Sequence, residues 1–153
     1  MKRCYNCKNE TLVATTADLE RKVASRTFKA AIPAIKCAAC GEETYAGPDL
    51  ESFDLAVAGE FANHGVAEAA AFAFMRRALG MKALELAELL DVAPETVSRW
   101  EHDKLPLERG PVALLTAMVL DRLEGRTTTL ERLRALRKPL PLPNMVNLVP
   151  RIA

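Results

Sequence analysis

Two Cys-x-x-Cys pairs constrain this chain more strongly than any other feature of its sequence. Cys4 and Cys7 form the first pair, and Cys37 and Cys40 form the second. Two thiolates spaced by two residues can point into one tight turn, and two such turns complete a tetrahedron around a zinc ion. The pattern therefore predicts one zinc site with four cysteine ligands, and we expect zinc as the cofactor.

The predicted role of this zinc is structural. Residues 1–46 would form a unit too small to bury enough apolar surface by itself, and structural zinc supplies about 10–16 kcal/mol of apparent binding free energy in small domains. A catalytic zinc keeps one coordination position open, which four cysteines would close. A redox pair needs a thioredoxin-like βαβ context, which the sequence lacks, and iron–sulfur ligation is the remaining alternative.

The residue pattern changes at Gly47-Pro48. Before it lie β-favouring pieces at 11–16 and 23–35, and after it apolar residues recur at helical spacing. Helices are predicted over 48–62, 66–79, 83–90, 94–102, 112–123 and 130–138. The predicted fold is mainly α, with a small N-terminal β-rich zinc ribbon and a five-helix C-terminal domain.

Residues 80–101 predict a helix–turn–helix. A narrow apolar stripe would be buried between the two helices; it consists of Leu86, Ala87, Leu90, Val92, Val97 and Trp100. Pro94 stands at the start of the second helix, where its missing N–H is not needed. The opposite face of that helix carries Thr96, Ser98 and Arg99, whose polar groups suit base edges and phosphates.

This motif resembles the helix–turn–helix of the XRE family of phage-repressor-like proteins, through residues 86–90 and 97–101 and Val92. Over residues 1–124, a zinc-binding domain followed by such a module resembles the MqsA-type antitoxin family, also described as YgiT-type zinc finger proteins. The resemblance implies a dimeric repressor that binds its own operator through the C-terminal domain. It also implies a toxin ribonuclease as partner of the zinc domain.

With that resemblance, the chain divides into four parts. They are a zinc-ribbon domain (1–46), a helical linker (47–66), an XRE-type DNA-binding domain (67–126), and an amphipathic helix with a Pro-rich tail (127–153). The expected partners are double-stranded DNA with a palindromic operator, a second copy of the chain, and the toxin.

The resemblance also places the second helix of the motif in the DNA major groove. The candidate DNA-binding residues are Lys82, Glu95, Thr96, Ser98, Arg99, His102 and Lys104. Arg99 is the candidate for a bidentate contact to guanine, worth about 1–3 kcal/mol of discrimination. His102 and Lys104 are expected to meet phosphates.

Two positions depart from the usual XRE pattern. Lys82-Ala83 replaces the Thr-Gln pair that often begins the first motif helix, so Lys82 reaches phosphate only as a point charge. Glu95 is acidic where a neutral side chain is usual; it either accepts from a cytosine amine or favours the helix N-terminus through the dipole.

The net charge of +1 excludes a polybasic tail protein and an acidic disordered one, and gives no case for nucleic acid. However, residues 47–75 hold five acidic residues and no Lys or Arg, and they mask the basic segments at either end of the chain, 1–46 and 111–153. DNA binding would therefore depend on the local placement of Lys82, Arg99 and Lys104, and on dimerisation.

Other charged and apolar residues receive structural interpretations. Glu101 is expected to pair with Arg77, and Arg76 is either a phosphate contact or a solvated side chain. The predicted core includes Phe72, Phe74, Met75 and Trp100, and His64 is expected in a linker turn.

A basic cluster follows in the last predicted helix and comprises Arg132, Arg134, Arg137 and Lys138. It either extends the DNA footprint or forms the solvated face of a helix whose Leu130, Leu133 and Leu136 point inward.

A homodimer is expected, because one recognition helix reads only a few base pairs, and paired helices lie about 34 Å apart on DNA. The apolar helix 112–123 is the expected dimer contact. An adaptor, whose zinc domain binds a protein while the helical domain only dimerises, is the alternative. We expect no enzyme, because no His, Asp or Glu completes an open metal site and no nucleophile–base pair is evident.

No apolar run approaches the roughly 18–20 residues that cross a bilayer, and the first residues lack the apolar stretch of a signal peptide. A soluble, cytoplasmic protein with no membrane partner is therefore expected, in which thiols stay reduced.

Overall fold

A long β-hairpin forms the N-terminal part of the molecule. In the computed structural model, which describes residues 3–150, β1 (Leu12–Val23) pairs with β2 (Arg26–Cys37) along its whole length, and the short β3 (Glu43–Thr44) pairs with β2. The sheet is antiparallel, with the order β1-β2-β3. Side chains alternate between its two faces, so that Ile32 and Ala34 are buried while Pro33 and Ile35 are exposed.

The hairpin corrects the strand pieces expected at 11–16 and 23–35. The first strand continues to Val23, and the second begins only after the turn at Ala24-Ser25. Residues 17–22 alternate between half-buried and exposed positions as a half-covered strand does, although four of the six are charged. The turn lacks Gly, Asn and Asp, the residues that usually signal a hairpin, and Ala24 itself adopts a φ of 53°.

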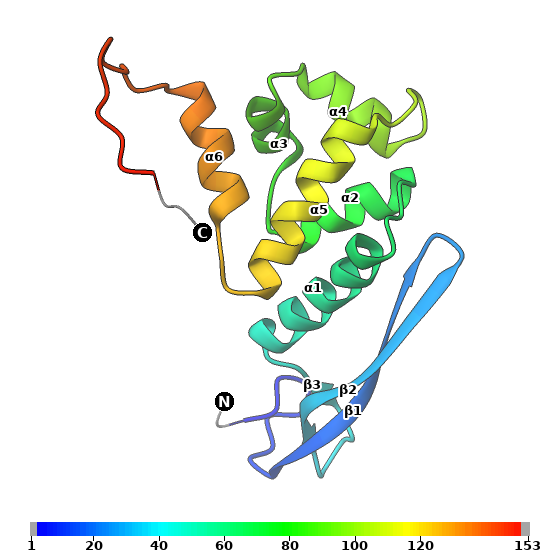
Figure 1. Cartoon of the computed structure of the whole chain (residues 1–153). Coiled ribbons are helices and arrows are strands. Elements are labelled where there is room, and N and C mark those ends of the chain that lie inside the picture. Colours follow the sequence, from blue (N-terminus) through cyan, green and yellow to red (C-terminus); the bar gives the residue numbers. More distant parts are fainter. Residues whose placement is uncertain (1–2, 151–153) are drawn as a thin grey trace.

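Within residues 3–150, six helices follow the sheet (Figure 1). They are α1 (Gly47–Asn63), α2 (Ala69–Ala78), α3 (Ala83–Leu90), α4 (Pro94–Glu101), α5 (Arg109–Leu123) and α6 (Thr128–Arg137). The mainly α fold with a small β-rich N-terminal part is confirmed. The bounds of α3 are those predicted, and the largest shifts are at the starts of α2 and α5. Val66 belongs to the turn rather than to α2, because its N–H donates to the Phe61 carbonyl at 3.0 Å.

The core is continuous from the sheet into the helices. Phe61 of α1 meets Phe28 of β2 with ring centroids 5.2 Å apart and Phe74 of α2 at 6.2 Å, both edge to face. On another side, α1 approaches α5 closely, because Gly59 has no Cβ to meet Leu123. The predicted core positions Phe72, Phe74, Met75 and Trp100 are all buried.

The apolar run of α5 is covered within the chain. Val112, Leu115, Met118 and Val119 are buried in the core that α5 shares with α1 and α2. The predicted dimer contact on this helix rests on a sequence that is too apolar for a solvent-exposed surface. Intrachain packing accounts for that property, so the reason for placing the contact there is removed.

Helix α6 packs against α5 and α3 less completely than expected. Leu133 is buried and Leu130 is half-buried, but Leu136 is 77% exposed, which corrects its predicted inward position. Within the basic cluster, Arg137 pairs with Glu88 of α3 at 3.3 Å. Residues 139–150 form no helix or strand, as the prolines predict. Across residues 3–150, no helix has the length and hydropathy needed to span a bilayer.

Candidate metal centre and nucleic-acid interface

Two tight turns bring the four cysteines together at the base of the hairpin. In the first, the N–H of Lys8 donates to the Cys4 carbonyl at 3.0 Å; in the second, the N–H of Gly41 donates to the Cys37 carbonyl at 2.9 Å. Lys8 and Gly41 occupy equivalent places, with φ of 62° and 76°. A left-handed residue is thus needed after each pair, and Lys8 adopts this conformation without being glycine.

The four sulfur atoms have the spacing of a tetrahedral zinc site. All lie within 4.8 Å of one another, with Cys4 Sγ 3.7 Å from Cys40 Sγ and Cys7 Sγ 3.5 Å from Cys37 Sγ. A tetrahedral ion with Zn–S bonds of about 2.3 Å holds its sulfurs about 3.8 Å apart. The cysteines form no disulfide. The predicted ligand set is therefore assembled, and its geometry and donor chemistry fit zinc.

Proximity also changes how the thiols ionise. Backbone N–H groups, of Cys40 foremost, hydrogen-bond the sulfur of Cys37 and lower its pKa to about 7. For Cys7, the backbone N–H of Asn9 favours the thiolate, but the sulfurs of Cys40, Cys37 and Cys4 together with desolvation raise the pKa to about 12. Opposite shifts arise because one thiolate makes the next one costly, and a bound cation relieves that cost.

The cysteine turns and the helices hold the hairpin at opposite ends. At the base, the N–H of Ala38 donates to Thr11 and that of Cys37 to Glu42, so the second turn continues the sheet. Toward the tip, Arg21 forms an ion pair with Asp54 of α1 at 2.6 Å. Arg26 pairs with Glu68, which precedes α2, at 2.7 Å; the paired carboxylate favours the cation and raises the pKa of Arg26.

Helices α3 and α4 cross around the short turn Asp91–Ala93. Asp91 adopts a left-handed conformation with φ of 54°, and the N–H of Val92 donates to the Ala87 carbonyl at 3.0 Å. Leu86, Ala87 and Val97 are completely buried where the helices cross. The predicted helix–turn–helix is therefore present as a structural unit, because the small Ala87 allows close packing.

The outer surface of α4 carries most of the predicted DNA-binding residues. Glu95, Ser98, Arg99 and His102 are exposed at helical spacing of three and four, and they form one stripe. Thr96 is half-buried beside this stripe. Lys104 is exposed in the loop after α4, where its N–H donates to the Arg99 carbonyl at 2.8 Å. These six residues lie on or next to one helix.

Lys82 lies apart from that stripe, at the start of α3. The Glu85 carboxylate accepts a hydrogen bond from the Lys82 backbone N–H at 2.7 Å. This carboxylate therefore already occupies the N-terminus of α3. The side chain of Lys82 is exposed. Any phosphate contact here would come from the ammonium group rather than from the free end of the helix.

His102 has one ring nitrogen engaged within α4. Its Nδ1 lies 2.7 Å from the Ser98 carbonyl oxygen, and because a carbonyl only accepts, Nδ1 carries the proton. The neutral ring then presents an acceptor at Nε2. A phosphate contact by His102 therefore requires the protonated, cationic ring.

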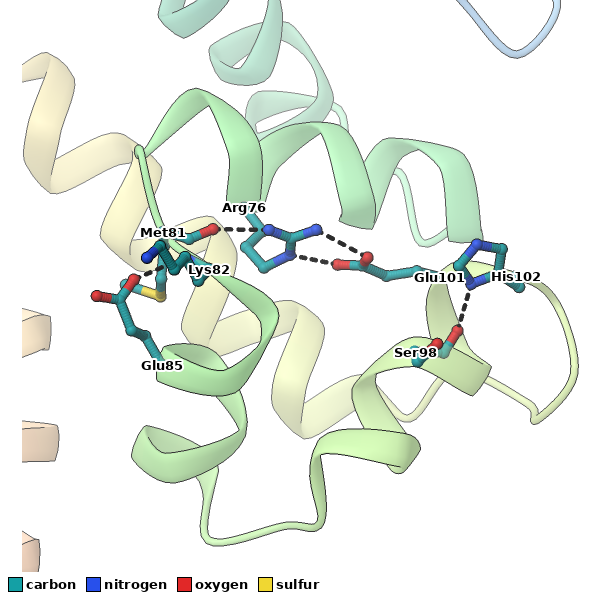
Figure 2. A network of polar contacts seen from close by, with 7 residues as sticks. All are labelled: Arg76, Met81, Lys82, Glu85, Ser98, Glu101 and His102. Atoms are coloured by element: carbon teal, nitrogen blue, oxygen red, sulfur yellow. Dashed lines mark hydrogen bonds and ion pairs between the residues drawn. The ribbon is translucent and has the colours of Figure 1, made fainter.

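The partner of Glu101 is Arg76 and not Arg77, which corrects the sequence prediction for both arginines (Figure 2). Arg76 Nε lies 2.5 Å from Glu101 Oε1, and Arg76 Nη2 donates to Glu101 Oε2 at 2.9 Å. Arg76 also donates to the Met81 carbonyl at 2.6 Å. The two side chains are only 13% and 8% exposed. One guanidinium thus links the start of α3 to the end of α4.

Helical spacing contained a signal for this pairing. Arg76 follows the buried Phe72 by four residues and precedes Leu79 by three, so it shares their face of α2. Arg77 is exposed on a neighbouring face.

No protein-family model, curated protein or solved structure matches this chain. The metal centre and the helix–turn–helix are therefore interpreted from their own geometry.

Replacing Cys37 with serine should abolish stable metal binding and unfold the base of the sheet. Three cysteines leave the tetrahedron incomplete, and part of the roughly 10–16 kcal/mol of apparent zinc binding free energy is lost. Elemental analysis of purified protein should give one zinc per chain for the wild type and much less for Cys37→Ser. Ala38→Ser is the matched control, because this exposed side chain lies in the same turn and is no ligand. Equal zinc content in Cys37→Ser would contradict the assignment.

Replacing Arg76 with methionine should lower the free energy of unfolding by about 3 kcal/mol, because it leaves the carboxylate of Glu101 buried without a partner. Urea denaturation followed by Trp100 fluorescence measures the change. Arg77→Met is the control and should barely move the midpoint. The double variant Arg76→Met/Glu101→Met should recover much of the loss, since it removes both charges. A loss in Arg77→Met equal to that in Arg76→Met would contradict the pairing.

Proposed function

We propose that this protein is a sequence-specific DNA-binding regulator that represses transcription and carries a structural zinc. The observation that carries the proposal is the α3–turn–α4 unit, in which a tightly buried stripe fixes α4 while Glu95, Ser98 and Arg99 project outward. In proteins of this architecture, the second helix enters the major groove and the N-terminal part of that helix contacts base edges.

The electrostatics of α4 support the same function. Arg99 and Lys104 form no ion pair within residues 3–150. Glu101, two residues after Arg99, is neutralised by Arg76 and turned toward α2. Glu95 shares the exposed stripe with Arg99, but the two form no ion pair within residues 3–150. The guanidinium of Arg99 is therefore available for a bidentate contact to guanine.

A dimeric repressor is part of the proposal. Helix α4 has eight residues and can contact only a few base pairs, so two copies are needed for a selective operator. Two recognition helices should then occupy successive major grooves of a palindromic site, about 34 Å apart.

The finer proposal is that the repressor is the antitoxin of a type II toxin–antitoxin pair. It rests on the resemblance to the MqsA-type family, in which a zinc domain precedes an XRE-type module. The joint presence of a four-cysteine cluster and a helix–turn–helix supports this reading. A cytoplasmic location is part of the same proposal.

Arg99→Ala should abolish operator selectivity while leaving the zinc content and the fold unchanged. Footprinting on the DNA upstream of the protein's own reading frame measures this. The wild type should protect two half-sites one helical turn apart, and the variant should protect neither preferentially. An unaltered footprint would refute the role of Arg99. If the wild type causes no salt-dependent shift of this DNA, the adaptor function replaces the repressor function.

The antitoxin proposal predicts a small ribonuclease-like protein encoded next to this chain, which should co-purify with it. Deleting residues 1–46 is unsuitable as a test, because their sheet shares the core of the helices. Co-expression of the full chain with the neighbour, followed by affinity purification of the untagged partner, is the measurement. A neighbour that fails to co-purify with the zinc-loaded protein contradicts the antitoxin reading but leaves DNA binding intact.

A further inference from the structure

An open cleft of about 460 Å³ separates the hairpin turn from the helix–turn–helix. Lys22 and Ala24 line it from the hairpin, and Arg77 on α2 and His102 at the end of α4 line it from the helices. Its lining also includes the small side chains of Ala70 and Ala73. The cleft brings together segments that are about 50–80 residues apart in the sequence, so periodicity within one helix or strand could not reveal it.

The charge in this cleft is positive. Of its lining residues, Glu101 is the acidic one, and its carboxylate is held by Arg76 in a bidentate ion pair. Lys22 and Arg77 form no ion pair in the described part of the chain, residues 3–150. Other cations of the hairpin differ in this respect, because Arg21, Arg26 and Lys29 are each paired with a carboxylate. Two cations that form no ion pair in residues 3–150 therefore line one open space.

The position of the cleft relates it to the proposed recognition helix. His102 follows Arg99 by three residues, so the cleft begins about 5 Å further along the axis of α4. When the N-terminal part of a recognition helix contacts bases, its far end approaches the sugar–phosphate strand that borders the groove, which is about 12 Å wide. The cations of the cleft lie at that end.

We propose that this cleft binds a phosphate group of the DNA backbone, with Lys22 of the hairpin and Arg77 of α2 as the two cationic contacts. The proposal rests on the proposed DNA-binding function and adds a second contact region to it. The zinc-bound sheet then takes part directly in DNA binding. The contact is to the backbone, so it adds affinity without reading sequence.

The test compares Lys22→Ala and Arg77→Ala with the wild type by fluorescence anisotropy, on the operator duplex and on an unrelated duplex, at several salt concentrations. Each variant should weaken binding to both duplexes by the same factor. The slope of log K against log salt should fall by about 0.9 for each lost phosphate contact. Lys22→Arg should restore the slope. The ratio of operator to unrelated affinity should stay at the wild-type value.

Lys36→Ala is the matched control. It removes one positive charge from the same hairpin, about 30 Å from the tip, where Lys36 pairs with Glu43. A drop in slope equal to that of Lys22→Ala would show a general charge effect and overturn the proposal. Circular dichroism and zinc content verify that each variant is folded.

Failure of this inference and failure of the proposed function give different results. If Lys22→Ala and Arg77→Ala bind like the wild type while Arg99→Ala loses selectivity, DNA binding stands and the cleft is not a phosphate site. If the wild type binds neither duplex, both proposals fail. Inorganic phosphate that shifts the amide resonances of Ala24 and Ala73, with unchanged DNA affinity in the variants, would assign the cleft to a free anion and overturn the DNA contact.

Discussion

The packing of α1 on two sides holds the sheet and the helices in one structure. Phe61 contacts the rings of Phe28 in the hairpin and Phe74 in α2, while Gly59 brings the end of α5 against the same helix. Val23 and Ile32 of the sheet consequently belong to one cluster with most of the buried residues of α1 to α5. Residues 1–46 therefore do not depend on a metal ion alone for their stability, although their size suggested that they would. The four-cysteine cluster closes the base of the sheet, and α1 covers the face that leads to the tip.

Where chemistry or chain geometry allows only one solution, the sequence predicted the structure well. The four thiolates of two Cys-x-x-Cys pairs can converge on one ion, and their sulfurs do lie together. Pro94 and the buried stripe located α4, because proline favours a helix start and the apolar spacing identifies the covered face. The hairpin was harder to predict, since Ala24 takes a left-handed conformation with no glycine to signal it.

The remaining differences arise where several partners compete for one residue. Arg76 and Arg77 are adjacent, and only the packing of α2 against α4 decides which of them reaches Glu101. The apolar run of α5 fits a subunit interface and an internal core equally well, and the core contains it. The net charge was also a poor guide to the local charge around α4. Asp54 and Glu68 of the acidic segment neutralise Arg21 and Arg26 of the hairpin rather than the cations of α4.

The length of the hairpin fixes a distance between two chemically different places. The register is continuous from Leu12↔Cys37 beside the sulfurs to Val23↔Arg26 beside the cleft, without a bulge. Removing two residues from each strand would keep every side chain on its present face. It would nevertheless shorten the reach by about 7 Å and withdraw Lys22 from α2. The length of the hairpin thus sets the distance between the cysteine cluster and the cleft. The number of residues in each strand is constrained by that distance, even at positions whose exposed side chains make no contact.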